Sequence, residues 1–502
     1  MRLRPALSIL LAGLLASCTG FSLGENGPGG DTWTEPPIPG DGEHKVGAIA
    51  VERDEDQLWV VHEENHKGVL RAHLSAIDPV TRATSEVLDV SGFDDRRVVF
   101  PGNDRMLLMA QQGGQEALVL FDTRTNARLA STVKPTWYWG TRTSPSGRAL
   151  VVADNADPKA PLHVIDTATL KHQVLAHDGD LVEAMWDHNS DVLLALSVKD
   201  PFGDHPVAKL LRYDLSTADL GAPLPAPTTT WQLDGYGWDF LFSFTWIGIS
   251  PDDRWAVFPL IKRTVGPADG QHVLLVLDQT TGALSEIAGS GPVGFTRDSK
   301  YIVSYGPRTG GGEDLWLIDP KTRARTTIEM PWAAAISYFV MHDSDHVIVT
   351  PVLGGGGASP VVVDTVTLAQ RPVDRTPLFL GDFVSRPGHD QLFVESDGQV
   401  IDLALATARA VDVPLAGIIN INVRPTADQA VAAYGYGARV YPIAMATRTV
   451  EGQIELPSPF ETAAADRLTA PASSRATRTD QPRLRTRRAH DGDAISLDLP
   501  AR

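Results

Sequence analysis

Short apolar runs alternate with polar turns along most of the chain. Runs such as ALVVAD, WAVFPL, YIVSYG and AVAAYG begin at Ala149, Trp255, Tyr301 and Ala430. Runs of this length, bounded by turn residues, are typical of buried β-strands. Helical periodicity is nearly absent, so the pattern predicts an almost all-β body.

An Asp-containing turn follows one apolar run in each repeat. Its side chains can bond backbone N–H groups and so hold two antiparallel strands in a tight hairpin. Successive copies lie 38 to 64 residues apart, and a period of about 40 to 45 with four strands per repeat indicates a β-propeller. We count nine units and predict a single propeller of seven to nine four-stranded blades. The turns lie at Asp78, Asp122, Asp166, Asp214, Asp278, Asp319, Asp364 and Asp402, with a degenerate copy at Pro442.

A second turn recurs earlier in each unit, as in SPSG from Ser144 and SPDD from Ser250. The phrase ISPDDRWAVF resembles the repeat of TolB-like and WD40-like bacterial propellers, and the resemblance covers residues 45–456. The regular Trp-Asp ends and Gly-His pairs of true WD repeats are missing. The resemblance therefore implies the propeller architecture without defining the subfamily.

The first eighteen residues carry an export pattern. Arg2 and Arg4 precede an apolar run too short to span a membrane as a helix, which favours a cleaved signal peptide. Leu15-Ala16-Ser17-Cys18 resembles the lipobox of bacterial lipoproteins. That resemblance implies removal of residues 1–17, acylation of Cys18 and anchoring in the cell envelope. Thr19 after the cysteine favours the outer membrane over the inner one. The alternatives are an ordinary secretory signal with a chance cysteine and a cytosolic protein with an apolar N-terminus.

Composition divides the rest of the chain. Residues 18–44 are rich in Gly, Pro and acids and predict a flexible tether before the propeller at 45–456. Residues 457–502 are rich in Ala, Pro and Arg and predict a disordered tail, either solvated or docked on an anionic partner. The net charge of −18 argues against nucleic-acid partners, and the single cysteine excludes an intramolecular disulfide.

No convincing catalytic or cofactor motif stands out. His62-Glu63-Glu64-Asn65-His66 matches the H-E-x-x-H zinc motif, but it follows LWVV and precedes Lys67-Gly68. That context predicts a hairpin turn rather than the helix that zinc binding requires. No G-x-S-x-G elbow or phosphate loop is present. We therefore expect no catalytic residues, no resident metal and no cofactor beyond lipid on Cys18. A divalent metal is an open alternative that no motif supports.

The aromatic stretch from Trp231 to Trp246 lies in the longest interval between turns. Trp231, Tyr236 and Trp238 have polar neighbours, which predicts partial exposure on an inserted loop at the mouth of the propeller. Exposed aromatic rings there would bind a protein partner or stack on sugars. The alternative is that these rings pack between adjacent blades.

Three functions remain open. The leading hypothesis is a non-enzymatic envelope lipoprotein whose propeller is a binding or assembly platform for protein or polysaccharide partners. The second is a propeller enzyme of lactonase or hydrolase type, with or without a metal. The third is a carbohydrate-binding receptor that uses the aromatic loop. A propeller supports many functions, so the fold alone does not choose among them.

Overall fold

Every regular element that the structure describes is a β-strand. The computed structural model describes residues 44–456 except for 52–56, 68, 90–93, 100–104, 113–114, 123–124, 126, 135–137, 155–161, 176, 201–204, 239–246, 264–269, 333–335, 341–343, 352–358, 375–382, 386–389, 395–398, 411–417, 425–428 and 435–438. Within these residues there is no helix, and hence none that could cross a membrane. The prediction of an all-β body is confirmed.

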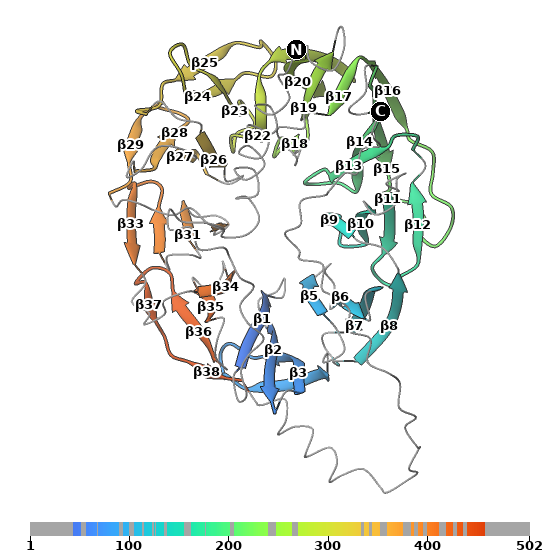
Figure 1. Cartoon of the computed structure of the whole chain (residues 1–502), viewed down its shortest axis with the longest axis vertical. Helices are drawn as coiled ribbons and strands as arrows, with labels where there is room; N and C mark the ends of the chain where they lie inside the picture. The colour runs from blue at the N-terminus through green and yellow to red at the C-terminus, as the bar shows by residue number, and fades with distance from the viewer. Residues whose placement is uncertain are drawn as a thin grey trace, which may run out of the picture. The chain divides into compact units, whose positions relative to one another are not determined.

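The described strands form nine antiparallel sheets, each made of strands that are consecutive in the chain (Figure 1). The first four sheets contain β1 His44–Val51, β2 Leu58–His66, β3 Val69–Ile77 and β4 Thr84–Asp89; β5 Asp94–Val99, β6 Arg105–Gln112, β7 Gln115–Asp122 and β8 Ala127–Lys134; β9 Tyr138–Thr143, β10 Ala149–Asp154, β11 Leu162–Asp166 and β12 His172–Leu175; and β13 Leu181–Trp186, β14 Val192–Lys199, β15 Val207–Asp214 and β16 Thr229–Asp234.

The fifth sheet has its first strand in two pieces, because β17 Tyr236–Trp238 and β18 Gly248–Ile249 both pair with β19 Trp255–Arg263. That sheet continues with β20 Gly270–Asp278 and β21 Ala283–Ala288. The remaining sheets contain β22 Ser290–Phe295, β23 Ile302–Pro307, β24 Glu313–Ile318 and β25 Arg325–Ile328; β26 Ile336–Val340, β27 His346–Pro351, β28 Val361–Asp364 and β29 Gln370–Pro372; β30 Phe383–Ser385, β31 Gln391–Val394, β32 Gln399–Asp402 and β33 Thr407–Ala410; and β34 Ile418–Arg424, β35 Gln429–Tyr434, β36 Arg439–Ala444, β37 Thr449–Val450 and β38 Ile454–Glu455.

The Asp turns join the third and fourth strands of the sheets, and their side chains act as the sequence predicts. Asp319 accepts hydrogen bonds from the backbone N–H groups of Lys321 (2.8 Å) and Thr322 (3.0 Å). The N–H of Arg323 closes the turn on the Asp319 carbonyl at 2.8 Å, with a φ of 63° at Arg323. These N–H bonds hold the pKa of Asp319 below its ordinary value even though burial opposes ionisation. Asp78, Asp364 and Asp402 accept bonds from their own turns in the same way.

Successive sheets pack face to face through apolar side chains. Clusters of buried residues join the β9–β12 sheet to β13–β16, β13–β16 to β17–β21, β17–β21 to β22–β25, β22–β25 to β26–β29, and β26–β29 to β30–β33. The last sheet packs on the first, because Val46, Leu58 and Val60 share a cluster with Val431 and Val440. Consecutive meanders that follow one another and return to the start are the arrangement of a β-propeller.

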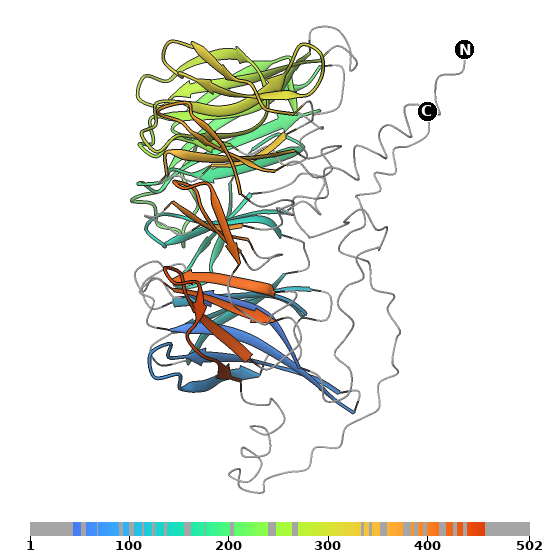
Figure 2. The same ribbon diagram turned by 90° about the vertical axis from the view of Figure 1, so that its left-hand side faces the viewer.

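The strands cross this unit from one face to the other (Figure 2). Because neighbouring strands are antiparallel, the turn between strands one and two and the turn between strands three and four lie at the same end of each sheet. We call this end the Asp-turn face. By the contacts among its residues, the chain consists of two units, Met1–Thr462 and Ala463–Arg502. The second unit lies outside the described residues.

Candidate functional site

The aromatic candidates lie where the β13–β16 and β17–β21 sheets meet. Trp231 belongs to β16, whereas Tyr236 and Trp238 belong to β17. Gly235, with a φ of 81°, connects the two strands. The prediction of one inserted loop from Trp231 to Trp238 is therefore wrong, since a glycine in the left-handed region passes the chain directly from one sheet to the next.

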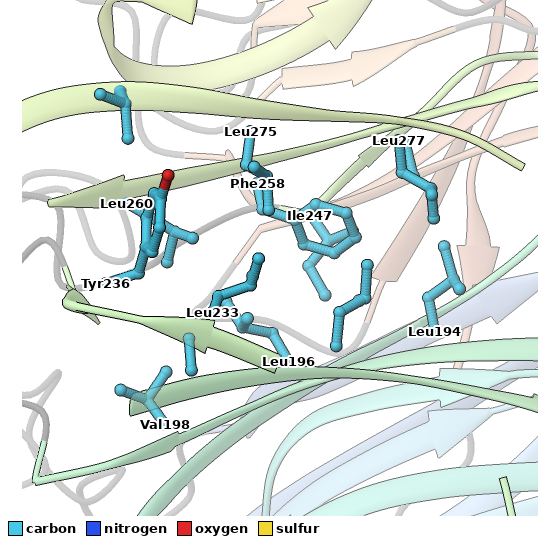
Figure 3. Packing of buried hydrophobic residues seen from close by; sticks show 14 of the residues in the cluster. Leu194, Leu196, Val198, Leu233, Tyr236, Ile247, Phe258, Leu260, Leu275 and Leu277 are labelled. Atoms are coloured by element: carbon cyan, nitrogen blue, oxygen red, sulfur yellow. The ribbon is translucent and has the colours of Figure 1, made fainter. Parts of the chain in front are cut away.

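Tyr236 contributes to the core between these sheets (Figure 3). Its side chain is buried together with Leu196 and Leu233 of one sheet and Phe258 and Leu260 of the other. The expected exposure of Tyr236 is wrong, because its ring fills the space between two apolar sheet faces.

Trp231 is half-buried at the outer strand of its sheet. It packs against the same core, and its Nε1 donates a hydrogen bond to the Gly282 carbonyl of the neighbouring sheet at 3.1 Å. Trp238 pairs through its backbone with Leu260, and its side chain lies outside the described residues. Packing between sheets, the alternative interpretation of the aromatic stretch, therefore describes Tyr236 and most of Trp231.

A polar cluster caps this core at the end opposite the Asp-turn face. The Tyr236 hydroxyl donates to Glu286, and Lys262 Nζ lies 2.7 and 2.9 Å from the two Glu286 carboxylate oxygens. The same Nζ lies 5.3 Å from the centre of the Tyr236 ring.

The interactions within this cluster shift the pKa values of its three side chains. Burial, together with the hydrogen bond to Glu286, raises the pKa of Tyr236, and the bond to Glu286 raises the pKa of Lys262. Burial opposes ionisation of Glu286, but bonds from Lys262 and Tyr236 outweigh it and lower its pKa. A nucleophile or general base needs a pKa moved toward neutrality. The pKa values of Tyr236 and Lys262 are moved away from neutrality, and the cluster ties together three strands of one sheet, β17, β19 and β21.

A buried carboxyl group lies at the other end of the same junction. Asp187, in the turn between β13 and β14, is 4% exposed. It accepts hydrogen bonds from Gln279 Nε2 (3.0 Å) and Ser190 Oγ (3.1 Å). Burial, reinforced by the nearby Asp253 carboxylate, raises the pKa of Asp187 to about 6. With this pKa, the charge of Asp187 changes close to neutral pH.

Asp253 reaches back from the neighbouring sheet into the turn that carries Asp187. It accepts hydrogen bonds from the backbone N–H groups of His188 (2.6 Å) and Asn189 (2.9 Å), and from Asn189 Nδ2 (2.9 Å). Gln279 follows Asp278 in the Asp turn of the same neighbouring sheet. Polar residues from three turns therefore clamp these two sheets at the Asp-turn face.

Similar clamps connect other sheets at this face. Ser146 donates through its backbone N–H and its hydroxyl to Asp191 of the next sheet. The Asp252 N–H donates to Ser299 Oγ at 3.1 Å, and the Ser344 hydroxyl donates to Asp390. These carboxylates and hydroxyls are engaged in holding turns against one another.

Sequence reasoning did not identify Asp187, Asp253 or Gln279 as members of one site. The signal lay in the turn between the first two strands, where WDHNSD from Trp186 occupies the place that SPDD occupies one sheet later. Aligning these first turns would have identified the two acids. Only packing of the sheets brings them together.

The H-E-x-x-H motif lies within strand β2, which ends at His66 before Lys67. The prediction that the motif spans a hairpin turn is wrong in detail, because all five of its residues pair with β3 in an unbroken register and residues 62–64 also pair with β1. His62 is buried and His66 is exposed. Four residues along a strand separate their Cα atoms by ~13 Å, too far for one zinc ion. Within the described residues, no group of three metal-ligating side chains is placed to hold an ion. Cys18 lies outside them.

No protein-family model matches the chain, and no curated protein matches it. Solved structures with a similar arrangement include a prolyl endopeptidase from a study of inter-domain dynamics in catalysis, at 10% identity and a TM-score of 0.38. That match covers 72% of this chain and 51% of the endopeptidase, so this chain spans about half of its length.

Two further matches cover more of their counterparts. Dihydro-heme d1 dehydrogenase NirN in complex with DHE is 14% identical, with a TM-score of 0.41 and coverage of 83% of this chain and 78% of that chain. TolB from Acinetobacter baumannii is 14% identical, with a TM-score of 0.30 and coverage of 68% and 76%.

Proposed function

We propose that the protein is a cell-envelope lipoprotein, anchored through lipid on Cys18, whose propeller is a rigid binding or assembly platform. Its nine sheets would be the blades of one closed ring, and its partners would be envelope proteins or polysaccharides. The lipobox-like segment Leu15 to Cys18 supports the anchor and an envelope location, with the outer membrane favoured by Thr19.

One observation carries the platform role. At the Asp-turn face, described acids bind either their own turn, as Asp319 does, or the turn of a neighbouring sheet, as Asp191 and Asp253 do. Such bonds fix the loops of neighbouring sheets relative to one another. A rigid array of loops suits the binding of a large partner because little conformational entropy is lost on association.

A hydrolase is the second candidate, and Asp187 is the observation in its favour. A general acid needs a carboxyl pKa raised toward neutrality, and Asp187 has one. Its two hydrogen bonds run to Gln279 and Ser190, however, and its side chain is buried between sheets. Burial of Asp187 in the contact between the two sheets therefore explains its raised pKa without a substrate. For this reason we favour the platform.

Mass spectrometry of the N-terminal peptide of the native protein tests the anchor. A peptide that begins at Cys18 and carries acyl chains is expected. An unmodified peptide, or one that begins elsewhere, would refute the anchor.

Crosslinking in intact envelopes tests the platform. We expect a defined partner at a fixed ratio to the tagged protein, and we propose Trp231, the half-exposed aromatic residue, and Trp238 as its contacts. The Trp231→Ala variant should lose that partner while Val174→Ser, at an exposed site on β12, should keep it. A melting curve for each variant separates lost binding from lost folding. Recovery of the protein without any constant partner would argue against the platform and favour substrate screening.

A further inference from the structure

Large apolar side chains are exposed at the tips of the Asp turns in three sheets. Val80 in the β3–β4 turn is 82% exposed, and Val366 and Leu368 in the β28–β29 turn are 70% and 42% exposed. Leu405 in the β32–β33 turn is 65% exposed. Single exposed apolar residues are common on proteins. These residues indicate a binding surface only if the fold does not require them and if they lie together on one part of the molecule.

The fold does not need these residues. In equivalent turns the position of Leu405 is a threonine, such as Thr322, whose Oγ1 accepts a hydrogen bond from the N–H two residues later. Leucine cannot make that bond. Leu368 has a φ of 61°, a conformation in which glycine is more stable than leucine. Both turns therefore hold an exposed leucine in a place where another residue would stabilise the fold better.

The three turns belong to one arc of the ring. The β26–β29 sheet packs on β30–β33, which contacts β34–β38 through β30 and β34, and the last sheet packs on β1–β4. Outside this arc, the position equivalent to Val80 is small or polar, namely Ala168, Ser216, Thr280 and Lys321. The apolar tips are thus gathered on one side of the Asp-turn face.

Arg82 lies beside one apolar tip, and Arg448 lies in another turn of the same arc. Arg82 follows Val80 by two residues, is exposed, and donates from Nη2 to the Glu451 carbonyl at 2.9 Å, which holds it between the first and last sheets. Arg448 occupies the equivalent place in the β36–β37 turn, within the same arc. Guanidinium groups beside apolar tips complement a layer of phosphate groups over hydrocarbon.

The spacing of the tips favours a bilayer over a protein partner. Packed sheets lie ~10 Å apart, so tips on different sheets are separate apolar projections. A protein interface needs a contiguous buried centre, whereas a bilayer accepts each projection independently.

We propose that this arc, defined by Val80, Val366, Leu368 and Leu405 with Arg82 and Arg448, rests on the phospholipid surface of the membrane that anchors the protein. The inference builds on the proposed lipid anchor. The 26 residue steps from Cys18 to His44 extend to as much as ~85 Å at ~3.3 Å each. Strand β1, eight residues long, crosses only ~26 Å, so an anchored chain can bring the Asp-turn face to the bilayer. Anchoring keeps the arc at a high effective concentration near lipid, so that weak insertion of each tip suffices.

Co-sedimentation with vesicles tests the arc apart from the anchor. The chain beginning at Thr19, which carries no acyl group, is mixed with vesicles of phosphatidylethanolamine and phosphatidylglycerol. We expect measurable binding, reduced about tenfold by each of V80S, V366S and L405S because each removes one partly inserted apolar tip. Val174→Ser, at an apolar site outside the arc that is 53% exposed, should bind like the parent chain. Equal melting temperatures exclude loss of folding.

Three outcomes would overturn the proposal. These are no binding to vesicles, equal binding by the arc variants and the Val174→Ser control, or a dimer of the Thr19 chain that the arc variants dissociate, which would make a second copy the occupant. If native Cys18 is acylated and the vesicles are not bound, the proposed function stands without this surface. If the vesicles are bound and native Cys18 carries no lipid, the surface stands and the anchor fails.

Discussion

Replacing Asp187 with Asn should stabilise the protein at and above neutral pH. The asparagine keeps the shape of the side chain, can still accept a bond from Gln279, and can donate to Ser190. What it removes is a carboxylate that is 4% exposed and faces the Asp253 carboxylate, with Arg212 as the opposing positive charge. The stabilisation therefore measures the cost of ionising Asp187 in the clamp.

The magnitude follows from the pKa. A rise from 3.8 to about 6 corresponds to about 3 kcal/mol, since one pKa unit is about 1.36 kcal/mol. The folded state holds the proton of Asp187 more tightly than the unfolded state. Its contribution is therefore fully present below pH 3.8 and is lost as the pH rises through about 6. The Asn variant should match the parent protein in acid and exceed it by up to about 3 kcal/mol above pH 7.

Thermal unfolding followed by circular dichroism from about pH 3 to about pH 8 gives the readout, because this range extends below the unfolded pKa and above the folded pKa of Asp187. For a unit of roughly 400 residues, with about 2.1 cal/mol/K of unfolding entropy per residue, 3 kcal/mol corresponds to ~3–4 °C in Tm. The quantity that matters is the Tm of the variant minus that of the parent at each pH, because other titrating groups cancel in it.

Asp364 provides a control, because its pKa is shifted in the direction opposite to that of Asp187. Burial opposes ionisation of Asp364, but N–H bonds from Thr367 and Val366 outweigh it and lower its pKa. Asp364→Asn should therefore destabilise at neutral pH, with the difference shrinking as the pH falls below 3.8. A constant Tm difference for Asp187→Asn across the pH range, or a less stable variant at pH 8, would refute the reasoning.

Four further substitutions test the packing of the sheets and the conformation of the turns by denaturant unfolding. Trp231→Phe removes the bond to the Gly282 carbonyl and should cost about 1 kcal/mol; an unchanged midpoint would contradict that role. Gly306→Ala would place a Cβ 1.9 Å from the Trp316 ring and should cost ~1–3 kcal/mol or more through overpacking; a neutral effect would mean that the ring moves freely. Arg323→Gly, at a φ of 63°, should stabilise by up to about 1 kcal/mol. Gly282→Ala, at a φ of 72°, should destabilise by about as much.

Local chemistry made the architecture predictable. An aspartate such as Asp319 satisfies N–H groups only two and three residues away, so its turn forms wherever two apolar runs flank it. Each of the eight Asp positions recognised along the chain ends or directly follows the third strand of a sheet, whereas the degenerate copy at Pro442 lies within β36, two residues before that strand ends at Ala444. The anchor at Cys18 also rests on local sequence and remains a prediction.

Whether a side chain is buried or exposed was harder to predict. Trp231 and Tyr236 are five residues apart, with polar neighbours, and were expected on one exposed loop. The left-handed Gly235 places them in different sheets instead, and Tyr236 is buried where those sheets meet. A local pattern defines the strand and the turn, but exposure depends on what the next sheet covers.

Long-range packing alone decided the candidate surfaces and the unusual ionisation. Asp187 and Asp253 are 66 positions apart, and their carboxyl groups influence each other only because two sheets meet at one face. Val80 and Leu405 belong to the same arc only because the last sheet packs on the first. The sequence by itself determined the repeats, the turns and the strands, since these depend on neighbours along the chain. The tertiary structure determined which repeats touch, and with that the buried charges and exposed apolar tips from which function is inferred.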